Sequence, residues 1–464
     1  MKNTEKKKEE SRNISIYEGS ATSVMSGAGD SYVVPYALVL NANNAEIGFL
    51  TSFVNLFSSF SQLYSSKLVY THSRKKVVLF AVFMQALLWL SLIAVGFLYW
   101  QGILKNEVVL LVIIFYSIIA IFGGIANPSW FSWMGDIVPV KIRGEYFSKR
   151  NIICGLIALI VTVTASFLLD YMKNIGFLIF GFWILFGLAS LGRFISLLFF
   201  TKMYEPKTKV DKKNYFTFSQ FIKKAPSTNF GRFSIYVGLI NLATYFASPF
   251  FLVYMLKDLN YNYVWFTLVN FSSAIFTAIS LPLWGKIGDY YGNKKLLTIG
   301  AIIIPFAPLP WLIFKNPIAL IFTAQIIAGF GWAAFNLAAS NFIYDAVTPQ
   351  RRAICVAYYT VINGVCIFIG AFLGGLFAEY IVLSWINVLL IIFLISAVLR
   401  VIFSLIMIPK IKEVRNIPEN KERLNFNQYI NLITPRPFHD LFHGVKGSIV
   451  ETSHINKIPK TPKR

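Results

Sequence analysis

The stretch Gly285–Lys295, which reads GKIGDYYGNKK, lies between two long apolar runs and carries the most distinctive local pattern in the chain. Its three glycines allow a tight turn and a close approach of the flanking segments. Asp289 offers a carboxylate close to the backbone of that turn, and Lys294 and Lys295 put positive charge where the next apolar run begins. The stretch therefore predicts a sharp polar connection between two apolar helices.

A weaker copy of this stretch lies 219 residues earlier, at Ser66–Lys76, which reads SKLVYTHSRKK. The copy keeps Lys67 and a closing basic cluster, but it lacks the glycines and has Tyr70 where Asp289 would fall. A second match joins DIVPVKIR at Asp136–Arg143 to DAVTPQRR at Asp345–Arg352, 209 residues later. Similar offsets relate further pairs, which are Asn127 with Asn336, Asp170 with Glu379, Arg193 with Arg400, and Pro35 with Pro249. Such a period predicts two related parallel halves.

The composition is that of an integral membrane protein. Of 464 residues, 56% are hydrophobic and 14% are charged, with a mean hydropathy of +0.61, whereas soluble domains average about 25% charged residues. The net charge of +22 could suggest a nucleic-acid partner, but the Lys and Arg residues fall between apolar runs rather than on one basic domain. Three cysteines in or beside apolar stretches make no disulfide framework.

Twelve apolar segments approach the ~20 residues that span a bilayer. Helix is the open element that satisfies its own backbone in lipid, so an all-α fold is predicted. The expected spans are 20–41, 46–66, 77–100, 107–135, 147–170, 175–200, 232–256, 263–284, 296–314, 318–344, 353–379 and 384–408. The predicted domains are a disordered N-terminal tail (1–19), a six-helix bundle (20–200), a basic linker (201–231), a second six-helix bundle (232–409) and a basic C-terminal tail (410–464).

The loop charges predict the orientation of the chain in the membrane. Twenty-one Lys and Arg residues fall in the even-numbered loops, and four fall in the odd-numbered loops. The positive-inside rule therefore predicts that both tails and the central linker are cytoplasmic.

The chain resembles the major facilitator superfamily (MFS) of secondary transporters. GKIGDYYGNKK is similar to that family's signature loop, which lies between helices 2 and 3 with a copy between helices 8 and 9, and here the better copy is the second one. The Asp-x6-Arg elements resemble the family's acidic-x6-Arg element after helices 4 and 10. The resemblance covers about residues 20–409 and implies the MFS fold, with two pseudo-symmetric bundles of six transmembrane helices. The resemblance also implies transport by alternating access, but it gives little information about the substrate.

Charged residues at the predicted cytoplasmic helix ends are candidates for gating. Carboxylates and guanidinium groups there can form charge-assisted bonds, and the resemblance implies that such clusters hold the outward-open state. The alternative is that they only orient helix ends and loops. The predicted gating residues are Asp136, Arg143, Asp289, Lys294, Lys295, Asp345 and Arg352.

Asp30 is the candidate for proton coupling, because it falls near the middle of the first predicted span. An acid at that depth costs ~2.5–3.5 kcal/mol to insert, which indicates a functional reason. Its neighbours are small, so a water-filled cavity could reach it, and the repeat pairs it with Thr244, which cannot titrate. A structural bond to a neighbouring helix and contact with a cationic substrate are the alternatives.

Polar and aromatic residues in the central helices are candidate substrate ligands, although helix packing would also explain each of them. Their uncharged amides and aromatic rings suit a neutral polar or amphipathic solute, and Arg193 and Arg400 are expected to snorkel or to pair with loop carboxylates. The candidates are Tyr32, Tyr36, Asn127, Trp130, Trp133, Asn241, Tyr245, Asn336, Asn341, Tyr358, Tyr359 and Asn363.

The sequence as a whole predicts a proton-coupled secondary transporter of a small solute in the plasma membrane, acting as a monomer among lipids. No phosphate-binding loop, cofactor motif or metal site is expected, so the protein is predicted not to be an enzyme. The alternatives are a transporter-like receptor that binds a ligand without moving it, and a drug or lipid exporter.

Overall fold

The structure is a computed structural model that describes residues 2–103, 107–139, 142–206, 217–381 and 386–415. These residues form helices and connecting turns, and none of them lies in a strand. The prediction of an all-α membrane protein is therefore confirmed. The C-terminal tail beyond Arg415 and residues 207–216 of the linker lie outside the described residues.

The helices fall into two sets joined by α8 (Phe218–Lys224). The N-half comprises α1 (Lys2–Ala28), α2 (Val33–Val39), α3 (Asn44–Thr71), α4 (Arg74–Trp100), α5 (Val108–Ile137), α6 (Arg143–Asn174) and α7 (Leu178–Lys202). The C-half comprises α9 (Asn229–Tyr245), α10 (Ser248–Val253), α11 (Tyr263–Tyr291), α12 (Asn293–Ile303), α13 (Pro310–Ile313), α14 (Pro317–Leu320), α15 (Ile326–Ala346), α16 (Pro349–Tyr380) and α17 (Val388–Met407).

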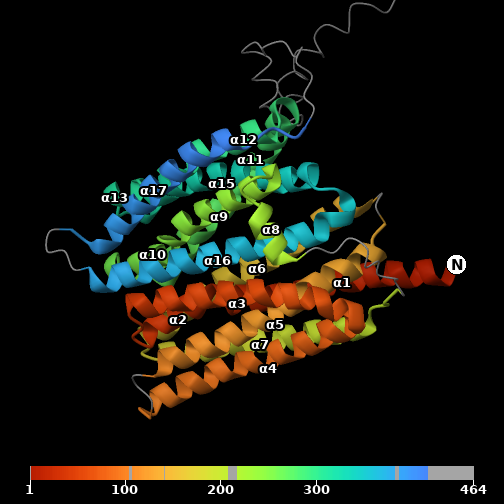
Figure 1. The fold of residues 1–464 in the computed structure, drawn as a ribbon. Coiled ribbons are helices and arrows are strands. Elements are labelled where there is room, and N and C mark those ends of the chain that lie inside the picture. The colour runs from red at the N-terminus through yellow and green to blue at the C-terminus, as the bar shows by residue number, and fades with distance from the viewer. Residues whose placement is uncertain (1, 104–106, 140–141, 207–216, 382–385, 416–464) are drawn as a thin grey trace, which may run out of the picture.

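Ten helical segments among the described residues are long and apolar enough to cross a membrane. The C-half contributes six of them, because α9–α10, α12–α13 and α14–α15 each continue through a short irregular turn as one segment. In the N-half, α1–α2 and α3 do not reach that apolarity. The helix α3 carries six serines, and α1 begins in a charged stretch, yet both pack among the other helices (Figure 1).

The N-terminal region corrects one expectation. Residues 2–19 were expected to be disordered, but they form the first turns of α1, which runs without interruption to Ala28. Ser11, Ser15 and Glu18 are buried there. The physical reason is that this segment packs its small and polar side chains against α6 and α7.

Side-chain caps explain where several helices begin. Asn43 and Glu46 form a capping box at the start of α3. Ser73, Thr228 and Asn262 each accept a backbone N–H in the first turn of α4, α9 and α11. Caps of this kind satisfy donors that have no partner within the helix.

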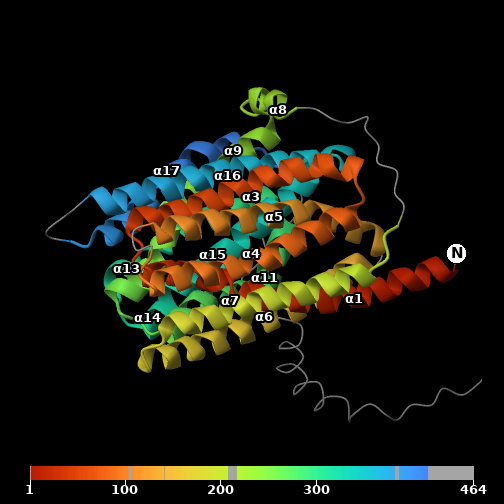
Figure 2. The same ribbon diagram turned by 90° about the horizontal axis from the view of Figure 1, so that it is seen from below.

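The two ends of the bundle differ in charge, and we name them accordingly. The basic end carries Arg74, Arg150 and Lys294, and the opposite far end carries the start of α3 and the turn before α11. In Figure 1 the basic end lies to the right with the N-terminus, and α2, α10 and α13 lie toward the left. Figure 2 shows the same long helices from below, all running between these two ends.

One buried apolar cluster contains residues of both halves, whereas the buried members of two further clusters each come from one half or the linker or tail beside it. The shared cluster packs Tyr32 and Phe182 of the N-half with Phe250 and Phe266 of the C-half. Toward the basic end, a C-half cluster forms around Phe335, and a small N-half cluster forms around Trp133. The halves therefore share a core near the far end and keep mainly separate cores near the basic end.

A reciprocal pair of contacts, which we name the far-end clamp, also joins the halves. Asp170 at the end of α6 accepts hydrogen bonds from the backbone N–H of Tyr263 (2.8 Å) and Val264 (3.0 Å) at the start of α11. Glu379 at the end of α16 accepts one from Asn44 (3.0 Å) at the start of α3. The internal repeat relates the two contacts, because 209 residues separate the acids and 219 separate Asn44 from Tyr263.

Glycines set the crossing of α3 and α16, the most intimate contact between the halves. A Cβ added to Gly48 would lie 2.6 Å from the carbonyl oxygen of Ala371 and 2.7 Å from the Cα of Gly375. Beside this crossing, Phe49 stacks on Phe372 with ring centroids 5.1 Å apart. The two backbones approach so closely because no side chain separates them.

The crossing generates a first prediction. The substitution Gly48→Ala should lower the thermal unfolding temperature of the detergent-purified protein, because overpacking at a backbone contact costs about 1–3 kcal/mol. The matched control is Gly187→Ala in α7, where an added Cβ meets nothing within 4 Å. Equal unfolding temperatures for the two variants would contradict the packing argument.

Candidate functional site

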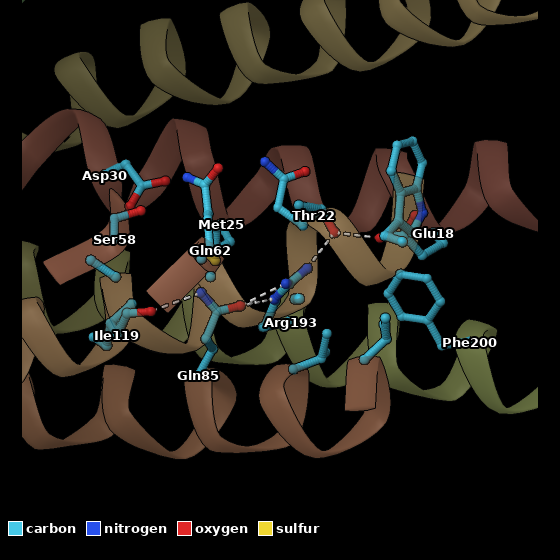
Figure 3. Close-up of a pocket in the computed structure, with 18 of the residues that line it drawn as sticks. Glu18, Thr22, Met25, Asp30, Ser58, Gln62, Gln85, Ile119, Arg193 and Phe200 are labelled. Atoms are coloured by element: carbon cyan, nitrogen blue, oxygen red, sulfur yellow. Dashed lines mark hydrogen bonds between the residues drawn. The ribbon is translucent and has the colours of Figure 1, made fainter. Parts of the chain in front are cut away.

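A cavity of about 400 Å³ lies inside the N-half. Side chains from α1, the turn after it, α3, α4, α5, α6 and α7 line it, and four of them are carboxylates or guanidinium groups: Glu18, Asp30, Arg150 and Arg193. Figure 3 shows Asp30 at one end of the cavity, Glu18 at the other, and Arg193 between Gln85 and Thr22. Two acids and two bases balance, so the described lining carries no net formal charge.

Asp30 lies in a 3₁₀ turn, Asp30–Tyr32, that separates α1 from α2. The turn packs closely on α4, because a Cβ at Gly29 would lie 2.5 Å from the ring of Trp89. The Asp30 side chain is exposed, and its carboxylate accepts a hydrogen bond of 3.0 Å from the Tyr116 hydroxyl. The carboxylate thus faces the cavity and has a neutral hydroxyl as a hydrogen-bond donor.

Arg193 forms the centre of the cavity's hydrogen-bond network. Its Nε (2.9 Å) and Nη2 (2.6 Å) both donate to Oε1 of Gln85, so the amide occupies one edge of the guanidinium fork. Nη1 donates to the Thr22 hydroxyl at 2.8 Å, and Gln85 in turn donates to the carbonyl of Ile119. Arg193 is 7% exposed, so the expectation that it snorkels is wrong. The partners that retain it inside are polar side chains of α1 and α4.

Glu18 and Arg150 form an ion pair that the sequence did not reveal. Their Oε2 and Nη2 atoms lie 3.0 Å apart, and Glu18 also accepts from Thr22 and Ser196. Arg150 lies over the ring of Trp130, 4.5 Å from its centroid. Glu18 falls in a stretch that reads as a polar tail, and Arg150 reads as a loop cation. The available signal was the spacing of four residues between Glu18 and Thr22 on one helical face.

The predicted substrate residues of the N-half divide into two groups. Asn127 and Trp130 line the cavity together with Asp30. Tyr32, Tyr36 and Trp133 are fully buried, and each donates to a backbone carbonyl: Tyr32 to Thr162 (2.7 Å), Tyr36 to Leu92 (2.8 Å) and Trp133 to Tyr204 (2.9 Å). The second group therefore has packing and hydrogen-bonding roles in this structure.

The predicted residues of the C-half are spread over several surroundings. Asn241 donates to Asn363 at 2.6 Å, which ties α9 to α16. Asn336, the repeat partner of Asn127, is exposed on α15, and Tyr245 and Asn341 are half-buried. The remaining two, Tyr358 and Tyr359, pack against the rings of Phe221 and Phe233.

At the basic end, the predicted charge clusters include partners that the sequence did not assign. Asp136 accepts from Arg74 at 2.6 Å, and in the C-half Asp345 accepts from Asn293 at 2.6 Å. The repeat relates these contacts too, since Asn293 occupies the position of Arg74. The side chains of Arg143 and Arg352 lie outside the described ones.

The basic end holds a second repeated contact that the sequence did not indicate. Glu205 accepts from the backbone N–H of Lys75 (3.3 Å), and Glu413 accepts from that of Lys294 (2.7 Å). Glu205 follows α7, the last helix of the N-half, and binds the start of α4. Glu413 follows α17, the last helix of the C-half, and binds the start of α12. Of the remaining predicted residues, Asp289 pairs with Arg415 at 3.0 Å, and the Lys295 ammonium lies 4.1 Å from the centroid of the Tyr291 ring.

Sequence comparison identifies the family. The family described as the Major Facilitator Superfamily matches residues 20–267 and 233–450. An MFS-type transporter of Aspergillus terreus is 28% identical over 123 residues, which is 26% of this chain and 22% of that protein. Protein SGE1 of Saccharomyces cerevisiae is 27% identical over 112 residues, or 24% and 20%. The matched stretch thus spans about a fifth of each of these relatives.

Solved structures share the fold at low identity. The nucleoside transporter NupG has a TM-score of 0.63 and 16% identity, covering 86% of this chain and 98% of that one. A POT family transporter solved with a thioalcohol-conjugated peptide has a TM-score of 0.65 and 11% identity, covering 87% and 96%. The fold, the repeated contacts and the family match agree, and the chain belongs to the major facilitator superfamily, as a multi-pass membrane protein.

Proposed function

We propose that the protein is a secondary transporter that carries a small solute across the plasma membrane by alternating access, acting as a monomer with both termini in the cytoplasm. Family membership and the fold of its solved relatives support transport. The proposed coupling ion is the proton, and the proposed carrier is Asp30. The observation that carries the proposal is an exposed carboxylate inside a cavity of about 400 Å³ that also holds Arg193.

The electrostatics of the cavity support proton coupling. With Asp30 ionised, the two carboxylates and the two guanidinium groups balance, and with Asp30 protonated the lining gains one positive charge. Charges interact more strongly in a low-dielectric region than in water. A net positive charge on the lining therefore changes the affinity of the cavity for a solute and for water. Protonation of Asp30 would therefore change the net formal charge of this cavity from zero to +1.

The contacts between the halves support alternating access. The far-end clamp and the shared apolar cluster join the halves at one end. At the basic end, the described ion pairs Arg74–Asp136, Arg150–Glu18 and Arg415–Asp289 each lie within one half or its adjoining tail. Each half can therefore move as a unit when the clamp opens. This state, closed at the far end, is proposed to be the inward-open one.

The substitution Asp30→Asn tests the coupling. Purified protein would be screened by thermal unfolding at pH 5 and pH 7.5 with sugars, amino acids, nucleosides, carboxylates and amphipathic cations, since a bound ligand stabilises by mass action. A stabilising compound is expected to lose its pH dependence in the variant. In proteoliposomes, uptake of that compound driven by a pH gradient should fall at least tenfold while exchange persists.

The matched control is Glu107→Gln, which removes an exposed acid of the same half outside the cavity lining. It should leave both the pH dependence and driven uptake unchanged. Driven uptake at the wild-type rate in the Asp30→Asn protein would show that the proton is carried elsewhere.

Neutralising both acids of the far-end clamp should favour the state that is open at the far end. A carboxylate at a helix N-terminus contributes about 0.3–1 kcal/mol, so the pair Asp170→Asn and Glu379→Gln should shift the populations about 3- to 30-fold. Spin labels at Lys173 and Lys315, which are exposed in the two halves, would report the far-end separation after the native cysteines are replaced. An unchanged distance distribution would mean that the clamp does not contribute to closure.

A further inference from the structure

A second cavity, of about 280 Å³, lies inside the C-half, and a single buried arginine contributes to its lining. Arg400 of α17 is 2% exposed, so the expectation that it snorkels to the interface is wrong as well. Its repeat partner in the N-half cavity is Arg193, 207 residues earlier. The two arginines therefore occupy equivalent places in the two halves, but their partners differ.

The partners differ at the edge of the guanidinium group that Nε and Nη2 form. In the N-half, Nε and Nη2 of Arg193 both donate to Gln85. The position equivalent to Gln85, 219 residues later, is Ile304, which has no side-chain acceptor. Among the described residues Arg400 makes one hydrogen bond, from Nη1 to the backbone carbonyl of Ile304 at 2.8 Å. The Nε of Arg400 is buried without an acceptor.

The sequence around Ile304 explains why that carbonyl can accept a hydrogen bond from Arg400. In a regular helix the donor to Ile304 would be the N–H of residue 308, which is a proline and has none. The carbonyl receives a longer bond of 3.3 Å from Ala307, in a tighter turn. The proline thus supplies one neutral acceptor to Arg400, and no described carboxylate lies within ion-pair distance of it.

The rest of the lining offers uncommitted polar groups and an apolar wall. Asn270, Ser273 and Gln325 line the cavity, and within the described part of the chain their side chains form no hydrogen bond. Trp311 and Trp332 provide flat apolar surface, and Trp332 has its ring centroid 6.0 Å from the Arg400 guanidinium carbon. An unpaired cation in such a place is costly unless a ligand completes it.

We propose that this C-half cavity binds the carboxylate group of an organic monoanion, with Arg400 as its cationic partner and the tryptophans against its apolar body. A guanidinium fork matches a carboxylate in geometry. One positive charge balances a monoanion, whereas a dianionic phosphate would leave one negative charge uncompensated among apolar side chains. The assignment of this group to the transported solute rests on the proposed transport function, but binding of the anion can be measured without transport.

Titration of the full-length purified protein with benzoate tests the proposal. Benzamide is the neutral isostere, and chloride and inorganic phosphate represent free anions. Benzoate should raise the unfolding temperature in a saturable way, and benzamide, chloride and phosphate should not do so at the same concentrations. Equal effects of benzoate and benzamide would overturn the proposal. Stabilisation by chloride or phosphate that requires Arg400 would also overturn it, in favour of a free-anion site.

Two variants test whether stabilisation by benzoate depends on the guanidinium group of Arg400. Arg400→Gln should weaken benzoate binding at least tenfold, whereas Lys315→Gln, which removes an exposed cation of the same half, should not. Because Arg400→Gln can also disturb folding, Ile304→Gln is the sharper variant. It installs the amide of the N-half opposite Arg400 and should weaken benzoate binding at least tenfold while preserving or raising the unfolding temperature.

The control for the second variant is Ile304→Leu, which should bind benzoate as the wild type does. Unchanged benzoate affinity in the folded Ile304→Gln protein would overturn the proposal. The outcome is separable from that of the transport function. Benzoate that binds through Arg400 but shows no counterflow in proteoliposomes would support the anion site and exclude the anion as the transported solute. Transport of another compound by a protein that does not bind benzoate would support the transport function and exclude the anion site.

Discussion

A charge buried among membrane-spanning helices must find its partners within the protein, and this constraint shapes both halves of the molecule. Each half carries one arginine at an equivalent depth. In the N-half the amide of Gln85 occupies the fork of Arg193, and Thr22 connects the guanidinium to Glu18. In the C-half a proline frees one backbone carbonyl for Arg400, and the fork stays empty. The two networks differ at the position of Gln85, which is Ile304 in the C-half, and at the position of Thr22, whose hydroxyl has no counterpart on Arg400 among the described residues.

This asymmetry gives the two cavities different chemistry. The N-half cavity holds two acids and two bases, and one acid, Asp30, is exposed within it. The C-half cavity has Arg400 as its charged group among the described lining residues. A proton site in one half and an anion site in the other would let protonation and solute binding act on separate units. Movement of the halves would then couple them, because each site lies within one half.

Among the polar contacts that join the halves, the two of the far-end clamp repeat with the chain. At the far end, Asp170 and Glu379 each accept from N–H groups that begin a helix of the other half and have no acceptor within that helix. At the basic end, Glu205 and Glu413 make the same kind of contact within their own half. Carboxylates at helix N-termini are individually weak. They can therefore stabilise one state without preventing the change to another.

The sequence by itself determined the all-helical membrane class, the two halves and the repeated charge positions, because hydropathy and local motifs follow directly from residue order. It also indicated Asp30, since an acid in the middle of a predicted span stands out. Tertiary structure decided the partners. Asp136 meets Arg74, and Glu18 meets Arg150 from a stretch that reads as a soluble tail. Tyr36 and Trp133 resemble cavity residues in sequence but donate to backbone carbonyls in the packed interior. The reason is that a pattern shows which face of a helix is polar, whereas the partner of a buried group depends on how helices distant in the chain pack together.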